Sequence, residues 1–194
     1  MREIIEAVGP CKLGHVTDRG GPAHDHYGAL LRAIVGQQLS VSAARSIYAR
    51  LTARYNGRTP TPRQLLRDDP EEMRAAAGLS RSKVVFLRDL AERVASKELV
   101  LEDLDDLPDE DVSAKLIEVK GIGQWTVDMF LIFHLGRPDV LPVGDLGIRR
   151  AAMLRYRLRK LPEPKRLITL ARPWRPWRSV ASWYLWASLR AIPA

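Results

Sequence analysis

Cysteine is nearly absent from this sequence, since Cys11 is the single cysteine among 194 residues. One thiol excludes an internal disulfide, a four-cysteine zinc site and a cysteine-held iron–sulfur cluster. Histidine is scarce too, and its four residues show no HExxH spacing, so we expect no metal catalyst and no required cofactor. His24 and His26 enclose Asp25, but without further ligands nearby we interpret them as surface residues.

Long apolar runs are also missing. No stretch approaches eighteen uninterrupted apolar residues, and the N-terminal "MREIIEAVGP" lacks the apolar core of a signal peptide. We therefore expect a cytoplasmic protein with no membrane partner. The apolar content of 46% is ordinary for a globular protein, and the length suits one domain, or one domain divided by a cleft.

Positive charge is what the sequence has in excess. Lys and Arg number 31 against 23 acids, which gives a net charge of +8 and a pI near 10.0. A pI above about 9 indicates a nucleic-acid binder, although charge that serves solubility alone is an open alternative. The charge is uneven, because residues 97–111 are strongly acidic whereas residues 149–178 are crowded with Arg.

Apolar residues recur at helical spacing almost throughout the chain. Tyr27, Leu30 and Ile34 share one helix face, and Ser40 is a candidate N-cap for the next helix. Pro at the first helical position opens the segments "TPTPRQLL" and "DDPEEMRAAAG". No segment shows the alternation of a strand. The sequence predicts an all-α fold of about ten short helices joined by tight connections.

The segment "VKGIGQWTVDMF", residues 119–130, places two glycines around Ile122. One predicted helix stops at Gly121 and another begins after Gly123, and glycine allows both positive φ and close approach of another molecule. Free N–H groups at the positive end of the second helix can bind an anion, which in a basic protein would be a DNA phosphate. Ile122 would hold the helices together and Lys120 would add charge. A plain helix–helix corner is the alternative.

A second feature, "LPVGDLGIRR", places Asp145 after a glycine-containing loop and at the head of a basic helix. The positive end of the helix dipole favours a negative charge at this position. Most aspartates that precede helices are structural N-caps, so the position alone supports either a structural or a catalytic role.

Four segments together resemble the helix-hairpin-helix–Gly/Pro–Asp superfamily of DNA glycosylases: "LLRAIVGQQLSVSAA", "LIEVKGIGQWTVDMF", "LPVGDLGIRRA" and "PWRPWRSVASWYLW". The Gln-Trp and Pro-Trp-Arg-Ser elements are most similar to the 3-methyladenine DNA glycosylase II (AlkA-type) branch. The resemblance runs from about residue 27 to 186. It implies a single domain over residues 1–194, with a middle helical subdomain at about 29–137, a second subdomain from 1–28 plus 138–194, and a cleft between them.

The resemblance also implies roles for individual residues. Asp145 matches the catalytic aspartate, whose carboxylate would stabilise the positive sugar of the transition state. Relatives with lyase activity carry a lysine where this sequence has Trp125, so no Schiff base is expected. Trp125 and Trp186 match the aromatic walls that hold a flipped, cationic base, with a core role as the alternative for each. Met129 replaces the tyrosine of that pocket.

Further roles follow from the same resemblance. Gln38 matches the wedge that fills the gap left by the flipped base, and Leu39 is the alternate candidate. The alternative interpretation of Gln38 is an ordinary buried glutamine with no role in DNA binding. The hairpin of this family often holds a monovalent cation (Na⁺ or K⁺) on main-chain carbonyls, here near Val119 and Ile122. The remaining tryptophans, Trp174, Trp177 and Trp183, are expected in the core or in the packing between domains.

The sequence therefore predicts a monofunctional glycosylase that excises alkylated bases from double-stranded DNA and acts as a monomer. The alternative is a non-catalytic helix-hairpin-helix module that recognises damaged or bent DNA.

Overall fold

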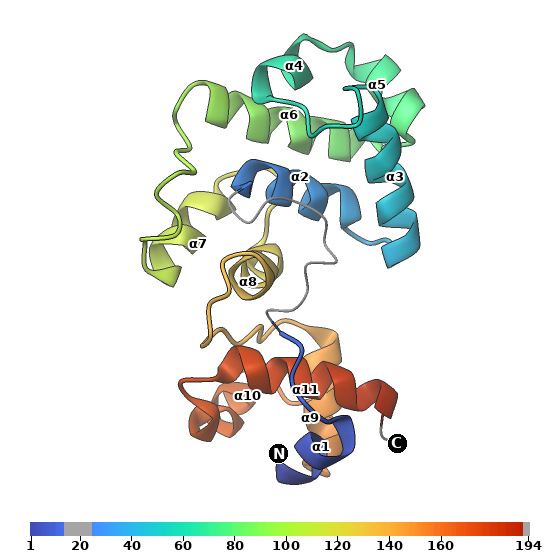
Figure 1. Cartoon of the computed structure of the whole chain (residues 1–194). Coiled ribbons are helices and arrows are strands. Elements are labelled where there is room, and N and C mark those ends of the chain that lie inside the picture. The colour runs from blue at the N-terminus through green and yellow to red at the C-terminus, as the bar shows by residue number, and fades with distance from the viewer. Residues whose placement is uncertain (14–24, 192–194) are drawn as a thin grey trace. The chain divides into compact units, whose positions relative to one another are not determined.

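The computed structural model describes residues 1–13 and 25–191, and within these residues the chain forms eleven α-helices and no strand (Figure 1). The all-α prediction is confirmed. The helices are α1 (Arg2–Val8), α2 (His26–Gly36), α3 (Val41–Ala53), α4 (Pro62–Arg67), α5 (Pro70–Ala77), α6 (Arg81–Ala95), α7 (Asp109–Ile117), α8 (Gln124–Phe133), α9 (Leu146–Arg155), α10 (Pro164–Leu170) and α11 (Arg178–Ala191), with a 3-10 turn at Arg172–Trp174. None of the helices in this part of the chain combines the length and apolar character needed to cross a membrane.

Helix starts follow the capping residues in the sequence. The Ser40 hydroxyl accepts a hydrogen bond from the Ala43 N–H at 3.3 Å and begins α3. Thr61 and Gln64 form a capping box at the start of α4, and Asp69 caps α5. Apolar spacing does not predict α1 or α10, because each is only seven residues long and a periodic pattern cannot repeat over so few residues.

The density of internal contacts divides the chain into two units, Met1–Gly20 with Asp128–Ala194 and Gly21–Val127. The division falls within α8, whereas the sequence suggests a subdomain boundary near residue 137. The expected subdomain bounds and the cleft between them stay predictions.

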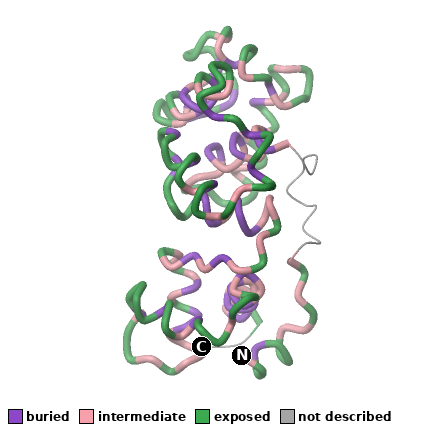
Figure 2. Tube along the Cα trace, turned by 90° about the vertical axis from the view of Figure 1, so that its left-hand side faces the viewer, coloured by how far each residue is buried: buried purple, intermediate pink, exposed green. Residues whose placement is uncertain are grey.

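The Gly21–Val127 unit is built around α6, which packs against α2, α4 and α5. Buried and exposed residues follow one another along its helices, as Figure 2 shows. Side chains that are completely buried fill its core: Leu30, Leu31, Ile34, Leu51, Leu65, Met73, Leu87, Leu90, Leu104 and Leu116. These apolar contacts hold α2 and α6 side by side, which matters for the hairpin described below.

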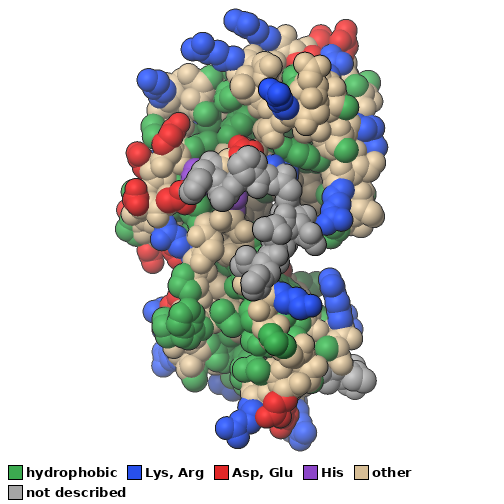
Figure 3. All heavy atoms as spheres, viewed as in Figure 1, with side chains coloured by type: hydrophobic (Ala, Val, Ile, Leu, Met, Phe, Trp, Pro, Cys, Tyr) green, Lys and Arg blue, Asp and Glu red, His purple; other side chains and the backbone are tan. Residues whose placement is uncertain are grey.

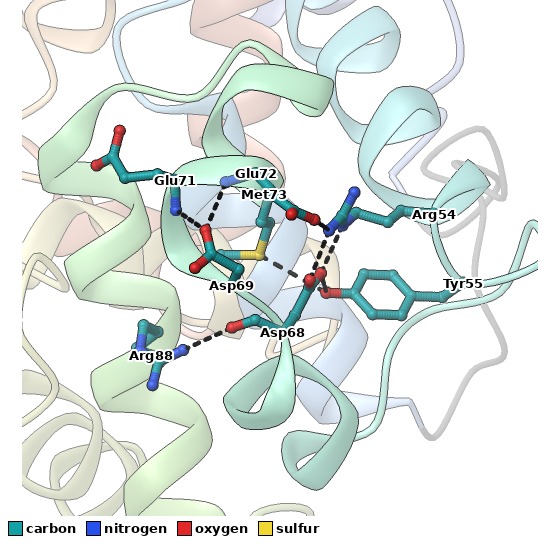
Figure 4. A network of polar contacts seen from close by, with 8 residues as sticks. All are labelled: Arg54, Tyr55, Asp68, Asp69, Glu71, Glu72, Met73 and Arg88. Carbon is teal, nitrogen blue, oxygen red and sulfur yellow. Dashed lines mark hydrogen bonds and ion pairs between the residues drawn. The ribbon is translucent and has the colours of Figure 1, made fainter.

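A polar network supplements this core where α3 meets the connection between α4 and α5 (Figure 4). The Arg54 guanidinium donates two hydrogen bonds to the Asp68 carboxylate, at 2.6 and 2.7 Å, and a third to Glu72 at 2.8 Å. The Tyr55 hydroxyl donates to Asp68 at 2.6 Å. The Arg54 hydrogen bonds hold the pKa of Asp68 below its ordinary value. The network therefore fixes the end of α3 far from the glycine hairpin.

The other unit joins the two ends of the chain. Helix α11 packs against both α1 and α9. Its apolar cluster consists of Ile4, Ile148, Ala151, Ala152, Leu167, Tyr184 and Leu185. The Tyr184 hydroxyl also donates a hydrogen bond to the Gly9 carbonyl at 3.1 Å. Helix α9, which begins directly after Asp145, is thus fixed by residues from both ends of the sequence.

Candidate functional site: a glycine hairpin and a capped aspartate

The hairpin between α7 and α8 requires glycine at its first position. Gly121 has φ +82°, in the region that favours glycine, and a Cβ there would lie 2.2 Å from Cδ2 of the Phe86 ring. Val119 and Ile122 are 1% and 4% exposed, so both side chains lie in the core of this unit. The backbone conformation and the neighbouring Phe86 ring therefore require glycine at position 121.

Gly123 is different. Apart from Gly123 itself and its two neighbours in the chain, no heavy atom of the described residues lies within 4 Å of the position that its Cβ would take, and its φ lies outside the left-handed region. Neither the backbone conformation nor a neighbouring side chain requires glycine here. A glycine that faces open space lets another molecule approach the main chain, and the first turn of α8, at the positive end of that helix's dipole, follows at once. This is the arrangement expected for an anion-binding turn.

Asp89 of α6 binds the hairpin through a hydrogen bond and an ion pair to Lys120. Its carboxylate accepts the Lys120 backbone N–H at 2.9 Å and lies 3.1 Å from the Lys120 ammonium, while Arg93 donates to it at 3.2 Å. Burial alone would raise the pKa of Asp89, but the hydrogen bonds from Lys120 and Arg93 lower it overall. Lys120 remains largely exposed, so its charge still faces solvent beside the turn.

Lys83, Phe86 and Asp89 of α6 lie close to the hairpin or to the end of α2 beside it. They are spaced three residues apart and share one face of the helix. The Lys83 ammonium donates to the carbonyls of Val35 and Gln37, at 2.8 and 3.0 Å, at the end of α2. Burial lowers the pKa of Lys83. One helix face therefore contacts both the end of α2 and the glycine hairpin.

The loop between α2 and α3, residues 37–40, carries the predicted wedge. Gln38 is exposed and has φ 57°, a left-handed conformation that is uncommon for a residue other than glycine. The interpretation of Gln38 as an ordinary buried glutamine is therefore wrong. Leu39 beside it is 39% exposed. Gln37, in contrast, turns back, and its side-chain amide donates to the Gly121 carbonyl at 2.7 Å.

In the other unit, Asp145 is the N-cap of α9. One of its carboxylate oxygens, Oδ1, accepts the Ile148 backbone N–H at 2.7 Å and the Trp186 indole N–H at 2.9 Å. A Cβ on Gly147 would lie 3.0 Å from that oxygen and 3.2 Å from Cδ1 of Trp186. Gly147 thereby lets the indole lie close to the first turn of α9. The orientation of the carboxylate is set by one main-chain and one aromatic donor.

The aromatic residues predicted for the pocket lie in different surroundings. Trp186 is half-buried and stacks on Phe133, with ring centroids 5.7 Å apart and an angle of 28° between the planes. Trp125, in the first turn of α8, is 47% exposed, so it is not a core residue. Met129 follows one turn later on α8 and is half-buried.

The other three tryptophans differ in how far they are buried. Trp174 and Trp183 pack against the apolar cluster of their unit, which confirms the core prediction for both. A core position is wrong for Trp177, which is 59% exposed. The physical reason is its position: Trp177 lies in the turn before α11 and not on the inward face of that helix.

The segment before Asp145, residues 137–140, is bound by the first two residues of α11, Arg178 and Ser179. The Arg178 guanidinium donates to both carboxylate oxygens of Asp139, at 2.7 and 2.9 Å, and this pairing holds the pKa of Asp139 below its ordinary value. The buried Ser179 hydroxyl donates to the Arg137 carbonyl at 2.6 Å and accepts the Val140 N–H at 2.9 Å. The Asp139 carboxylate therefore has a structural role in this segment.

His26 corrects another expectation. It is 5% exposed, and its Nε2 lies 3.2 Å from Asp105, so it is a buried and not a surface residue. His26 also lines a hollow of about 830 Å³, together with Tyr27 and Arg58, that contains none of the predicted site residues. His24 lies outside the described residues.

The distribution of charge agrees with the uneven sequence. On the face shown in Figure 3, basic side chains are dispersed over the helices, whereas acidic ones gather in the Gly21–Val127 unit where α7 and the connection before it lie. The acidic side is therefore the less suitable part of that face for a polyanion.

Sequence reasoning missed Gln37, Phe86, Asp89 and Gly147. The three-residue spacing of Lys83, Phe86 and Asp89 on α6 was available as a signal, but nothing in the sequence pairs this face with residues 120–121. Gly147 lies in the first turn of a predicted helix, where glycine is unfavourable and indicates a close contact.

A glycine hairpin that faces open space, followed by a Gly/Pro loop and a helix capped by an aspartate, defines a helix-hairpin-helix protein of the Gly/Pro–Asp type. Residues 31–176 match the family described as HhH-GPD superfamily base excision DNA repair protein. The chain belongs to that superfamily.

Individual proteins named as 3-methyladenine glycosylases are also similar to this chain. The chain is 35% identical over 187 residues to DNA-3-methyladenine glycosylase 1 of Schizosaccharomyces pombe, which covers 95% of this chain and 80% of the relative. It is similar to the solved structure of the S. pombe 3-methyladenine DNA glycosylase in complex with abasic DNA, with a TM-score of 0.85, 34% identity and coverage of 98% and 91%. It is also similar to the DNA-3-methyladenine glycosidase of Bacillus halodurans, with a TM-score of 0.77, 36% identity and coverage of 95% and 86%.

Proposed function

We propose that this protein is a monofunctional DNA glycosylase that hydrolyses the N-glycosidic bond of alkylated bases, of the 3-methyladenine type, in double-stranded DNA. The observation that carries the proposal is the Asp145 carboxylate, held by the Ile148 N–H and the Trp186 N–H beside an aromatic ring. The names of the relatives, and the abasic DNA bound to one of them, support the choice of substrate.

In the proposed reaction, a water oxygen forms a bond to C1′ of the deoxyribose while the bond from C1′ to the base nitrogen breaks. The electron pair of that bond leaves with the base and cancels the positive charge of the alkylated ring. Positive charge that develops on the sugar would be stabilised by Asp145, which would also accept a proton from the water. Because this charge exists only in the transition state, a fixed carboxylate accelerates the step without tightening ground-state binding.

DNA would be held by its phosphates at the hairpin, where the main chain is open at Gly123 and the positive end of the α8 dipole follows. Trp125 and Trp186 would present aromatic faces to a flipped base, and a cationic base would be attracted by about 0.5–2 kcal/mol per face. Gln38, exposed at the loop tip, would fill the gap in the duplex, with Leu39 next to it.

The sugar should stay intact after base release. Strand cleavage by a glycosylase of this kind needs an amine that forms a Schiff base, and Trp125 stands where such a lysine would be. Borohydride should therefore trap no covalent complex between the protein and DNA.

The hairpin would also hold a monovalent cation on the carbonyls of Val119 and Ile122. The Val119 carbonyl accepts the Ile122 N–H at 3.0 Å and, like any carbonyl oxygen, has a second lone pair, so the two main-chain oxygens suit a hard cation. Such an ion would add positive charge where a phosphate binds.

The test is Asp145→Asn. The amide oxygen of asparagine can still accept both N–H groups, so the cap remains while the negative charge is lost. Release of 3-methyladenine from a duplex that carries one such base should fall by at least about 10²–10³-fold, with binding of undamaged duplex retained.

The alternative is a non-catalytic module, and the N-cap hydrogen bond to Ile148 favours it, because that bond gives Asp145 a structural role without any chemistry. Unchanged base release by the Asn variant, or no release by the native protein, would favour this alternative.

A further inference from the structure

We infer that Gln37 is a positioning residue that joins the wedge loop (residues 37–40) to the glycine hairpin, so that both meet DNA as one preformed surface. The inference rests on the proposed function, because the wedge has a role only where a base leaves the duplex.

The Gln37 side chain makes a contact across 84 residues of sequence. Its amide nitrogen lies 2.7 Å from the Gly121 carbonyl oxygen and 3.4 Å from the Thr126 hydroxyl. A carbonyl can only accept, so the nitrogen and not the oxygen of the amide must face Gly121. A hydrocarbon or carboxylate side chain at position 37 could not make this bond.

The main chain of Gln37 is held independently from the opposite side. Lys83 donates to the Gln37 carbonyl and to the Val35 carbonyl, two oxygens at the end of α2 that have no partners further along the helix. The loop therefore has one attachment on its backbone, from α6, and one through a side chain, to the hairpin.

The hairpin end of this link is itself rigid. Gly121 lies directly against the Phe86 ring, and the neighbouring Lys120 N–H is bonded to Asp89. Both Phe86 and Asp89 belong to α6, the helix that carries Lys83. Gln37 thus closes a ring of contacts that runs from α6 to the loop, to the hairpin and back to α6.

The residue after Gln37 shows why such a link is useful. Gln38 has φ 57° and is exposed, so an uncommon backbone conformation is maintained at an exposed loop tip. A loop freed at Gln37 would sample other conformations, and the entropy of fixing it again would be lost at the moment of binding.

Gln37→Met tests the link, because methionine has a similar length but cannot donate to Gly121. The first measurement needs no DNA: amide hydrogen exchange should become faster at residues 37–40 and 121–122, with exchange in α4 and α5 unchanged. Lys83→Met frees the same loop from its other attachment and should speed exchange at 37–40 as well. Unchanged exchange in a folded Gln37→Met protein would overturn the inference, whatever the enzyme does.

The second measurement is binding, at one salt concentration, to a duplex with a tetrahydrofuran abasic-site analogue and to the same undamaged duplex. Gln37→Met should weaken binding to the analogue by up to about tenfold, the value of one hydrogen bond, and leave the undamaged duplex within about twofold. In a Gln38→Ala background, Gln37→Met should have less than about twofold further effect, because Gln37 acts through the wedge.

Multiplicative losses in the Gln37/Gln38 double variant, or equal losses on both duplexes, would show a merely structural role and overturn the inference. If the native protein itself does not prefer the analogue, the proposed function fails instead, and the exchange measurement still decides whether Gln37 positions the loop.

Discussion

The indole N–H of Trp186 donates a hydrogen bond to Oδ1 of Asp145 over 2.9 Å, although 41 positions separate the two residues. The same indole stacks on Phe133 and lies over Gly147, which has no side chain to obstruct it. A residue expected only to form a wall for the base therefore also orients the carboxylate. The two roles predict different consequences for different substitutions.

Trp186→Phe should separate these roles, because phenylalanine keeps an aromatic face and loses the N–H donor. A hydrogen bond to a charged group contributes about 1.5–3 kcal/mol, so the rate of base release at saturating DNA should fall roughly tenfold to a hundredfold. Single-turnover assays on a 3-methyladenine duplex would measure it. Loss of affinity alone, with an unchanged rate, would contradict the orienting role.

The two hairpin glycines should respond in opposite ways to added side chains. Gly121→Ala places a Cβ against Phe86 at positive φ, so we expect a loss of stability of about 1–3 kcal/mol. Gly123→Ser adds a side chain that faces open space, and serine is a good residue before a helix, so the melting temperature should not fall. DNA binding should nevertheless weaken, because the side chain obstructs the approach of a phosphate.

Fluorescence anisotropy with a duplex and thermal melting would be measured on both glycine variants. Normal DNA affinity of a folded Gly123→Ser protein would count against the hairpin as the phosphate site.

Trp125 and Trp183 form a matched pair for truncation. Trp125 is 47% exposed, so Trp125→Ala should change the free energy of unfolding little while reducing base release. Trp183 packs against the apolar cluster, so Trp183→Ala should lower stability by about 3–5 kcal/mol if it behaves as a core residue. Denaturant unfolding and base-release assays would be compared, and normal release by the Trp125 variant would remove it from the pocket.

The Asp139–Arg178 pair predicts acid sensitivity. The pKa of Asp139 is lowered in the folded protein, so its stabilising contribution is complete above the ordinary aspartate pKa of about 3.9 and is lost as the pH falls through the lowered value. Asp139→Asn should lower the melting temperature at pH 7 and make its decline below about pH 4 less steep. Asp103→Asn, an exposed change between α6 and α7, is the control and should leave the profile unchanged. Parallel profiles for native protein and Asp139→Asn would refute the pairing.

Local signals in the sequence predicted local structure well. Ser40, Asp69 and Asp145 begin helices as their residue types indicate, because a cap depends only on neighbouring N–H groups. The hairpin was predicted for the same reason, since two glycines between apolar helices define it within a few residues.

Contacts between distant segments could not be predicted in this way. The bond from Gln37 to Gly121 and the ring of Phe86 against Gly121 depend on how α2, α6 and the hairpin pack together. His26 is buried and its ring lies 3.2 Å from Asp105, far along the chain, which the tripeptide "HDH" does not reveal. Short helices such as α1 and α10 were missed because their packing, and not their periodicity, defines them.

The order in which the hairpin and α11 are translated has a consequence for the nascent protein. Arg178, Ser179 and Trp186 bind the segment before Asp145 or orient its carboxylate, and all three belong to α11. Helix α1 packs against the same helix. The hairpin and its supports on α2 and α6 are translated much earlier. A partly synthesised chain would therefore hold the hairpin and its supports while the Asp145 carboxylate still lacks the contacts that orient it, and these contacts can form only once α11 has been made.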